Sequence, residues 1–348
     1  MRSLVSTVTI DSIKEIKNSD FLVLVGFKEN GWKCVTTKDS VTMGDIGLYF
    51  EVDSFLPTDV EAFEFLKKNG IQKMYTGELG MRLRTIKLRG QVSQGLYLSE
   101  SSFPGFNIFS NSIQDDLGVI QYKIEPSISM EGDVIAEYPS HTPRSFQPRI
   151  QNELDFFTDY KGIAFERTMK LEGVSTSFIV NDGIVQPASH NTVYKANERF
   201  SLWTYAERIG LDKALEKLNL NVTIQGEFMG PKIQGNIENL EQNQFYVYNI
   251  FNIDSATWYS RKQRLFLIEY INFLMNNGNQ LLHVPTLDES IKIFDEVDSL
   301  DELLDMANGP SMKAHLREGD VYKSLEPVDG SYVQFKVISN KYLLKEKE

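Results

Sequence analysis

Short runs of β-branched and aromatic residues, separated by turn signals, recur in the first 140 residues and limit the possible folds more than any other feature. The turn signals include Asn30 with Gly31 and residues 43–45. Five strands in so short a span predict a small β-barrel, and an OB fold fits their number. The runs are FLVLVGF (21–27), KCVTT (33–37), GDIGLYFEV (44–52), RLRTIKLRG (82–90) and QGLYLS (94–99).

Basic residues are concentrated in the segment 67–89, although the whole chain has a net charge of -12. Since OB barrels commonly present a basic, aromatic face to single-stranded nucleic acid, this segment is a candidate nucleic-acid contact. The alternative interpretation is a structural barrel with a charged surface. The candidate contact residues are Arg82, Arg84, Lys87 and Arg89.

A polar stretch with three prolines, residues 138–152, predicts the boundary between two domains. With 348 residues the chain exceeds one comfortable hydrophobic core, so we expect one domain in residues 1–140 and another in residues 141–348. The second domain mixes strand and helix patterns, which predicts an α+β fold built on antiparallel sheet. We expect helices in 201–219 and 261–277, and strands in 221–229, 244–253, 319–324 and 331–339.

An acidic segment, residues 288–307, follows in the same domain. Its apolar residues recur at helical spacing, so we expect one or two helices whose acidic face is solvated.

Several classes of protein are excluded by composition. No apolar run approaches the roughly 20 residues that span a bilayer, and the N-terminus lacks the apolar core of a secretory signal, so we expect a cytoplasmic, intracellular protein that makes no use of a membrane. The single cysteine, Cys34, excludes an intrachain disulfide and makes a cysteine-based zinc site implausible. The four histidines show no ligand spacing.

The stretch FERTMKLEGVSTSF, residues 165–178, places Lys170 two residues before Glu172 and three before Gly173. Such a lysine is either a nucleophile at a nucleotide pocket or part of an ordinary strand that ends in a turn. The pattern alone is weak, because it arises by chance in roughly one chain in six of this length. Its weight comes from four later stretches: QGEFMG with Glu227, FYVYNIF (245–251), REGDVYK with Glu318, and FKVISNKYLLK with Lys336.

In this order the five stretches resemble the covalent nucleotidyltransferase superfamily, the ATP-dependent ligases and capping enzymes that carry a nucleoside monophosphate on a lysine. The resemblance covers nearly all of residues 149–345. Other stretches, GDIGLYFEVDSFLP, LRTIKLRGQVSQGLYL, QPRIQN and GEFMGPKIQGN, are similar to the ATP-dependent RNA ligases of the Deinococcus and Naegleria type, in which an OB domain precedes the catalytic domain. DNA ligases and capping enzymes place that domain after the last motif, whereas only 12 residues follow Lys336 here.

The resemblance implies an OB-fold β-barrel followed by a nucleotidyltransferase domain with an ATP-grasp-like antiparallel β-sheet. It implies that Lys170 attacks the α-phosphorus of ATP and then carries AMP. Glu172, with the turn at Gly173, would contact the ribose or a metal-bound water. Lys336 would hold the α-phosphate, and Arg149 would contact the ATP phosphates.

Glu227 and Glu318 would, by the same resemblance, bind the ribose or a metal ion. Their hard carboxylate oxygens suit Mg²⁺ or Mn²⁺. One aromatic of the stretch 245–251 should stack on adenine. Phe245 and Tyr248 fall on opposite faces of a strand, so alternation does not choose between them, and we prefer Phe245 only slightly.

A lysine amine is nucleophilic only when it is deprotonated, so its pKa must be lowered by a cation, by a metal or by desolvation. We expect Lys336 and a divalent ion to supply this field. Two positions depart from the family. Ile338 stands where many members have a second lysine, for which Lys341 or Lys323 could substitute, and Glu172 stands where most relatives have aspartate.

We therefore expect an ATP-dependent RNA ligase, acting as a monomer, that joins 3′-hydroxyl and 5′-phosphate ends through lysyl-AMP and an adenylylated 5′ end. Its partners would be RNA or RNA-containing duplexes, and its substrates nicks. The alternatives are a DNA ligase, a capping-type nucleotidyltransferase, or a nucleic-acid-binding protein whose catalytic domain has decayed. Domain order disfavours the first two, and the intact set of Lys170, Glu227, Glu318 and Lys336 disfavours decay.

Overall fold

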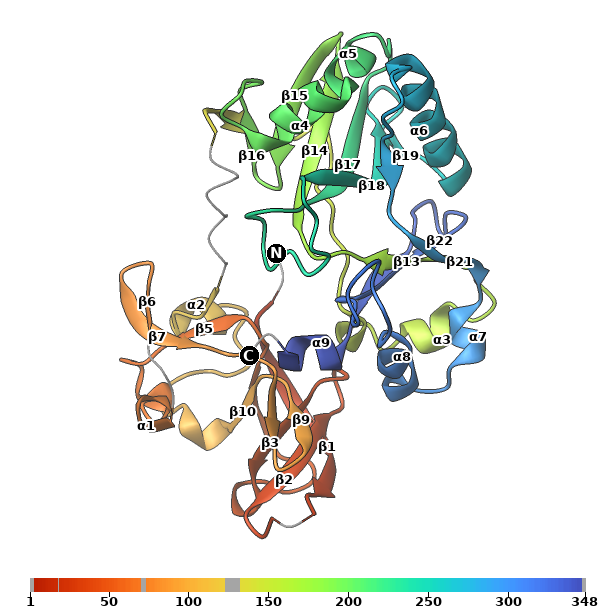
Figure 1. Ribbon diagram of the computed structural model, residues 1–348. Coiled ribbons are helices and arrows are strands. Elements are labelled where there is room, and N and C mark those ends of the chain that lie inside the picture. The colour runs from red at the N-terminus through yellow and green to blue at the C-terminus, as the bar shows by residue number, and fades with distance from the viewer. Residues whose placement is uncertain (1–2, 18, 70–72, 123–131, 346–348) are drawn as a thin grey trace. The chain divides into compact units, whose positions relative to one another are not determined.

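The computed structural model describes residues 3–17, 19–69, 73–122 and 132–345 (Figure 1). The chain divides into two compact units. The first comprises Met1–Ile124, Ile150–Asp155 and Leu343–Glu348, and the second comprises Glu125–Arg149 and Phe156–Tyr342. The expected domain boundary after residue 140 stays a prediction.

A five-stranded antiparallel sheet lies in the described part of the first unit, in the order β10-β4-β1-β2-β3. β1 pairs with both β2 and β4, and its register with β2 shifts between Ile10 and Ser12, as a bulge does where a strand bends. The sequence predicted strands over or within the other four segments, but β1 was not predicted. The strands are β1 (Val5–Glu15), β2 (Leu22–Phe27), β3 (Lys33–Thr37), β4 (Ile46–Phe50) and β10 (Leu96–Ser99).

A second sheet of the first unit has the order β11-β5-β7-β6, and a separate hairpin joins β8 to β9. Its apolar core includes Leu56, Phe63 and Phe103 packed against Phe50 of β4. The remaining elements of this unit are β5 (Ser54–Pro57), β6 (Lys73–Tyr75), β7 (Glu78–Arg82), β8 (Ile86–Leu88), β9 (Gln91–Ser93), β11 (Ile120–Gln121), α1 (Leu66–Asn69) and α2 (Ile113–Asp116).

The short segment Ile150–Asp155 belongs to the first unit although it follows residues of the second. The amide of Asn152 bridges two groups there: its Oδ1 accepts from the Trp32 indole N–H at 2.5 Å, and its Nδ2 donates to Glu51 Oε1 at 2.9 Å. The N–H of Gly31 also donates to the carbonyl of Gln151 at 2.6 Å. The chain is therefore fastened to the barrel directly after Arg149.

The second unit contains a large sheet in the order β12-β16-β15-β14-β17-β18-β19, and β20 pairs with β18. Helices α4, α5 and α6 pack on it through one apolar core that includes Leu202, Leu215 and Ile271 (Figure 1). Gly210, with φ of 77°, separates α4 from α5 where the sequence predicted one amphipathic segment. The elements are β12 (Val134–Glu137), β14 (Val174–Asn181), β15 (Ile184–Ser189), β16 (Thr192–Tyr194), β17 (Val222–Met229), β18 (Gln244–Asn252), β19 (Thr257–Trp258), β20 (Leu282–His283), α4 (Ser201–Ile209), α5 (Leu211–Glu216) and α6 (Arg261–Met275).

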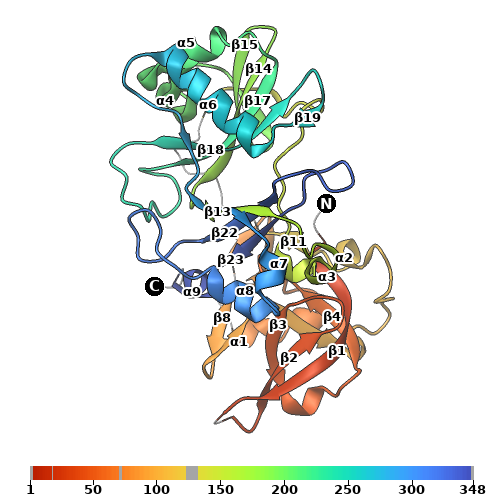
Figure 2. The same ribbon diagram turned by 90° about the vertical axis from the view of Figure 1, so that its right-hand side faces the viewer.

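A smaller sheet of the second unit has the order β21-β13-β22-β23. Figure 2 shows α7 and α8 beside it, and Phe294 of α7 meets Phe165 and Phe335 with ring centroids 5.7 Å and 5.4 Å away. The elements are β13 (Phe165–Lys170), β21 (Thr286–Ile291), β22 (Gly319–Ser324), β23 (Gln334–Ile338), α3 (Phe156–Asp159), α7 (Ile293–Glu296), α8 (Leu300–Met306) and α9 (Asn340–Lys345).

One sequence-based expectation is corrected by this unit, and one stretch is packed more closely than its composition suggests. The acidic segment 288–307 is helical in α7 and α8 only, because its first residues form strand β21, which pairs with β13. Part of the proline-rich stretch is also packed rather than free. Thr142 is buried and donates to Thr223 Oγ1 at 2.7 Å, and the carbonyl of Pro143 accepts from Gln225 at 2.8 Å.

Candidate active site

Strands β13 and β22 place Lys170 and Glu318 together. β13 ends at Lys170, which pairs with Gly319 at the start of β22. The Lys170 Nζ lies 2.7 Å from Glu318 Oε1, with side chains 22% and 19% exposed. A Cβ on Gly319, at φ of 157°, would lie 2.1 Å from the carbonyl oxygen of Val337. Glycine therefore permits the close approach of β22 to β23 directly beside Glu318.

The turn after Lys170 brings Glu227 to the same place. Gly173 precedes β14, whose Ser175 pairs with Glu227 of β17. A Cβ on Gly173 would lie 2.5 Å from the Phe228 carbonyl oxygen and 2.9 Å from Glu227 Cγ, so a larger residue would separate the two strands. The N–H of Gly173 donates to the Glu227 carboxylate. The glycine predicted as a turn thus positions an acid of the site.

The charge state of Lys170 in the free protein is set by two neighbouring acids. Burial lowers the pKa of its amine, but the carboxylates of Glu318 and Glu227 raise it by more, so the net pKa lies above its ordinary value. Without a ligand, the two acids keep the amine protonated. Nucleophilic attack therefore requires that the field of these acids be cancelled first.

The pKa of Glu227 is shifted in the direction that burial dictates. Burial raises the pKa of its carboxyl to about 7, and the nearby Glu318 adds to this rise, whereas Lys170 and Lys336 oppose it. A carboxyl with such a pKa changes charge within the physiological pH range.

Two cations complete the group. The backbone of Arg149 forms a bridge with that of Lys336, and the Lys336 N–H donates to the carbonyl of Pro148 at 2.9 Å. Arg149 lowers the pKa of Lys170, and Lys336 lowers the pKa of Glu227, so both cations contribute to the electrostatic potential of the site. Lys336 on β23 and Arg149 of the proline-rich stretch thus lie side by side.

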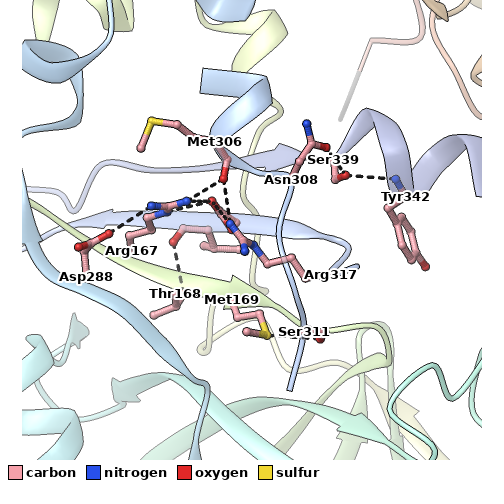
Figure 3. Close-up of polar contacts among 12 residues, drawn as sticks. Arg167, Thr168, Met169, Asp288, Met306, Asn308, Ser311, Arg317, Ser339 and Tyr342 are labelled. Carbon is pink, nitrogen blue, oxygen red and sulfur yellow. Dashed lines mark hydrogen bonds and ion pairs between the residues drawn. The ribbon is translucent and has the colours of Figure 1, made fainter. Parts of the chain in front are cut away.

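Glu172 is held by groups that sequence reasoning missed. The Tyr342 hydroxyl of α9 donates to Glu172 Oε1 at 2.8 Å, and the N–H of Ile237 donates to Oε2 at 3.2 Å. Figure 3 shows that Ser339 links Tyr342 to Asn308: its hydroxyl accepts from the Tyr342 N–H at 3.1 Å and donates to Asn308 at 2.7 Å. No spacing rule relates Tyr342 to Glu172, so only the fold reveals the contact.

Replacing Tyr342 by phenylalanine tests this hydrogen bond. The ring keeps its packing while the bond to a charged group, with a typical net value of about 1.5–3 kcal/mol, is lost. We expect roughly tenfold slower lysine labelling by nucleotide in single-turnover assays, with the melting temperature lowered by only a few degrees. Tyr270→Phe, on the outer face of α6, is the matched control. Equal rates for the two variants would show that Glu172 does not depend on Tyr342.

The aromatics of β18 lie on two sides of the large sheet. Phe245 is fully buried in the core beneath α4–α6, where it meets Phe178 at 5.2 Å between ring centroids. Tyr246 and Tyr248 belong to a different apolar cluster, which contains Met169 next to Lys170. The Tyr248 hydroxyl shares a hydrogen bond with Ser175 at 2.6 Å, and burial together with Glu227 raises its pKa. The ring placement therefore favours Tyr248 over Phe245 as a nucleotide contact.

The lysines considered as substitutes at Ile338 are placed differently from one another. Ile338 itself is buried opposite Gly319. Lys323 is bonded to Asn249, and burial together with Arg264 lowers its pKa well below the ordinary value. Lys341 is exposed on α9. Lys323 pairs with Glu166 of β13. Because alternate residues of a strand point to one face, Glu166 and Lys170 share a face, and Lys323 lies on that same face of the sheet.

The four basic candidates of the first unit are not equivalent. Arg82 pairs with Asp53, with NH2 2.6 Å from Oδ1, and lies over the ring of Tyr122 at 5.0 Å. Arg84 and Lys87 are exposed, and Arg89, with φ of 47°, lies in the turn of the β8–β9 hairpin. Arg82 is therefore part of the fold, and the other three are open to a ligand.

A buried ion network behind Lys170 was not predicted. Figure 3 shows Arg167 of β13 donating to Asp288 at 3.2 Å and to the Met306 carbonyl at 2.8 Å. Its Nε also donates to Asp320 at 2.9 Å, and Arg317 donates to the same carboxylate at 2.6 Å. The network ties β13, β21, β22 and α8 together. Charged residues inside strands, Arg167, Asp288 and Asp320, were the available signal.

Within the described residues, no group of three or more His, Cys, Asp or Glu side chains could hold a metal ion. Glu227 and Glu318 are the two acids whose fields act on Lys170. No helix within the described ranges is long and apolar enough to cross a membrane.

The chain forms a small antiparallel barrel followed by a two-sheet domain. In that domain one lysine lies between two acids and a second lysine lies on the last strand. Together these features define a protein of the nucleotidyltransferase class. Comparisons with known proteins narrow this class. An OB-fold domain model matches residues 4–99, and the RNA ligase family model matches residues 164–342. The search of curated proteins finds no match.

Solved structures agree with the family models over the whole chain. A mutant Naegleria gruberi RNA ligase with ATP and Mn is 33% identical, has a TM-score of 0.88 and covers 99% of both chains. The Naegleria gruberi RNA ligase with PPi is also 33% identical, with a TM-score of 0.88, covering 100% of this chain and 99% of the other.

The chain belongs to the RNA ligase family. It is an enzyme with an N-terminal OB fold and an antiparallel-sheet nucleotidyltransferase domain, as the sequence predicted.

Proposed function

We propose that this RNA ligase uses ATP and joins 3′-hydroxyl to 5′-phosphate ends in three steps, each a transfer at phosphorus. The observation that carries the proposal is the Lys170 amine, 2.7 Å from Glu318 and within the fields of Glu227 and Arg149. Solved relatives that hold ATP, AMP or pyrophosphate support the choice of nucleotide. We also propose that the chain acts as a monomer.

In the first step the Lys170 nitrogen attacks the α-phosphorus of ATP. A nitrogen–phosphorus bond forms, the bond to the β-phosphate oxygen breaks, and pyrophosphate leaves. The attacking form is the deprotonated amine, so the Lys170 ammonium, which contacts Glu318 in the free protein, must first lose its proton. Lys336 and Arg149 would stabilise the charge that builds up on the phosphates. Tyr248 is our choice for the contact to adenine.

The donor set fits a divalent cation that keeps several waters. Glu227 and Glu318 offer hard oxygens near the phosphates, which suits Mg²⁺ or Mn²⁺. When bound, the cation would neutralise these carboxylates and the triphosphate, and so lower the pKa of the amine. Two mutants of the Naegleria relative contain Mn with ATP or AMP.

The two later steps use the RNA ends. A 5′-phosphate oxygen attacks the lysyl-AMP phosphorus, which breaks the nitrogen–phosphorus bond and gives a 5′-5′ pyrophosphate. The 3′-hydroxyl then attacks the 5′-phosphate, and AMP leaves. The first unit would hold RNA through Arg84, Lys87 and Arg89, which are exposed, rather than through Arg82, which is paired.

Labelling of the protein by nucleotide tests this proposal. The protein is incubated with α-labelled ATP or GTP and Mn²⁺, and the denatured protein is examined for label. We expect label from ATP and at most a few per cent as much from GTP. Label from GTP alone would indicate a capping-type activity, and no label from either would indicate a decayed domain.

Nick composition tests the choice of substrate. We expect nicks with RNA on the 3′-hydroxyl side to be sealed at least about tenfold faster than all-DNA nicks, because a 2′-hydroxyl can be recognised beside the reacting 3′-hydroxyl. Sealing rates are compared at equal levels of adenylylated enzyme. Equal rates would refute the preference for RNA.

The pKa of Glu227 predicts a pH dependence of metal use. Because burial raises this pKa to about 7, the carboxylate that binds a cation becomes the dominant form only as the pH rises through that value. The charged fraction grows from about one-tenth at pH 6 to about nine-tenths at pH 8. We expect the Mn²⁺ concentration for half-maximal labelling to fall across this range. In Glu227→Gln the dependence should flatten, and an unchanged dependence in that variant would exclude Glu227 as its origin.

A further inference from the structure

A cavity of about 940 Å³ lies within the first unit, and its lining includes none of the residues proposed for the ligase chemistry. Barrel strands β3 and β10 contribute Val35 and Leu96, and the β8–β9 hairpin contributes Ile86 and Leu88. Phe65, just before α1, completes the apolar lining. The volume is that of a ligand site rather than of a packing defect.

The lining is accessible rather than sealed. Phe65 is 41% exposed, and Ile86, Leu88 and Leu96 are half-buried. The hairpin is fastened to the barrel because Ser93 accepts from the Val35 N–H at 2.9 Å, so this wall is fixed in place. A preformed apolar surface of this extent on a single unit is usually a binding surface.

The charge around the cavity selects the kind of ligand. None of the described residues that line it is acidic, in a chain with a net charge of -12. Arg84 lines the cavity and is exposed, whereas Arg82 is occupied by Asp53. The hairpin adds Lys87 and Arg89. An apolar pocket beside exposed cations suits a ligand that carries flat apolar groups on an anionic backbone.

We propose that this cavity holds unpaired bases of the RNA substrate. Phe65 stacks on a base, and Arg84 binds the adjacent phosphate. A duplex keeps its bases stacked inside, so only a strand with unpaired nucleotides can reach the pocket. This inference rests on the proposed function only in that RNA is the substrate.

Binding of single-stranded RNA to Phe65→Ala tests the pocket. Phe106→Ala is the matched control, because Phe106 belongs to the same unit, is 42% exposed and does not line the cavity. Two oligonucleotides are compared by fluorescence anisotropy: an RNA, and the same backbone with abasic sites. We expect Phe65→Ala to weaken binding of the RNA about fivefold or more and to leave binding of the abasic strand unchanged. Equal affinities of the two variants for the RNA would overturn the proposal.

Two further variants guard against misfolding and separate charge from stacking. Phe65→Trp keeps an aromatic ring, and its fluorescence should be quenched by RNA but not by the abasic strand. Arg84→Gln should weaken binding of both strands alike and lower the salt dependence by about one phosphate contact. Quenching by both strands, or by neither, would contradict stacking at Phe65.

Labelling of Lys170 by ATP distinguishes failure of this inference from failure of the proposed function. Phe106→Ala, the control outside the pocket, should be labelled as the unchanged protein is. Absence of label in the unchanged protein would sink the ligase mechanism, whatever the pocket binds. Normal labelling of the protein, together with no effect of Phe65→Ala on RNA binding, would refute the proposed role of the pocket and leave the ligase mechanism standing.

Discussion

Lys170→Arg should abolish labelling of the protein by ATP, with a loss on the order of 10³-fold or more. Arginine keeps the positive charge that faces Glu318, so the local fold is expected to survive. A guanidinium, however, does not lose its proton in proteins and cannot attack phosphorus. Label is counted on the denatured protein after incubation with α-labelled ATP and Mn²⁺.

Lys341→Arg is the matched control, since it makes the same exchange at an exposed lysine of α9 and should leave labelling unchanged. Sealing of a pre-adenylylated RNA strand provides a second readout. That step needs no lysine nucleophile, so Lys170→Arg should retain much of it. Label that persists in Lys170→Arg would place the nucleophile elsewhere.

The charge state of Lys170 links this prediction to the rest of the site. The same carboxylates that suit a divalent cation also hold the amine protonated in the free protein. Burial alone would activate the lysine, but Glu318 and Glu227 outweigh it. We propose that activation of the amine is coupled to ligand binding, so that the proposed nucleophile stays protonated when no nucleotide is bound.

The candidate site could be proposed from the sequence because its residues lie in stretches whose order carries information. Lys170, Glu227, Glu318 and Lys336 each have an unremarkable sequence context, yet the fold gathers them on neighbouring strands. Tyr342 could not be predicted in this way, since its partner Glu172 is 170 positions away and no repeat relates them.

Other failures have local physical causes. β1 is an 11-residue strand whose burial alternates only in part, and a register shift interrupts its pairing, so strict alternation does not reveal it. Which face of the sheet each side chain of β18 points to also depends on the pairing of β18 with β17. The register of β17 with β18 shifts between Gln225 and Gly226, near Tyr248, and that shift is invisible in the sequence of β18.

The proline-rich stretch shows a different limit. Its composition is typical of a linker, but Thr142 and Pro143 supply hydrogen bonds to β17, and Arg149 joins the backbone of Lys336. Polar residues and prolines are common both in linkers and in extended segments that lie along a sheet. Composition alone cannot distinguish the two.

Lys336→Ala should slow labelling of Lys170 about 10²–10³-fold, because one charge at the α-phosphate contributes on the order of 3–4 kcal/mol to its transition state. The expected loss is large since the neighbouring Ile338 cannot replace it and is itself buried against Gly319. Rates are measured in single turnovers at saturating ATP. Lys336→Arg should recover part of the rate.

A second readout follows from the electrostatics of Glu227. Lys336 lowers the pKa of this carboxyl, so its removal should raise that pKa and move the Mn²⁺ dependence to higher pH. Lys323→Met is the informative comparison. Lys323 lies on the same face but is engaged by Asn249, with Glu166 opposite it. Should Lys323→Met lose labelling while Lys336→Ala stays within about threefold of the unchanged protein, the phosphate contact would belong to Lys323, and the lysine missing at Ile338 would have been replaced from the adjacent strand.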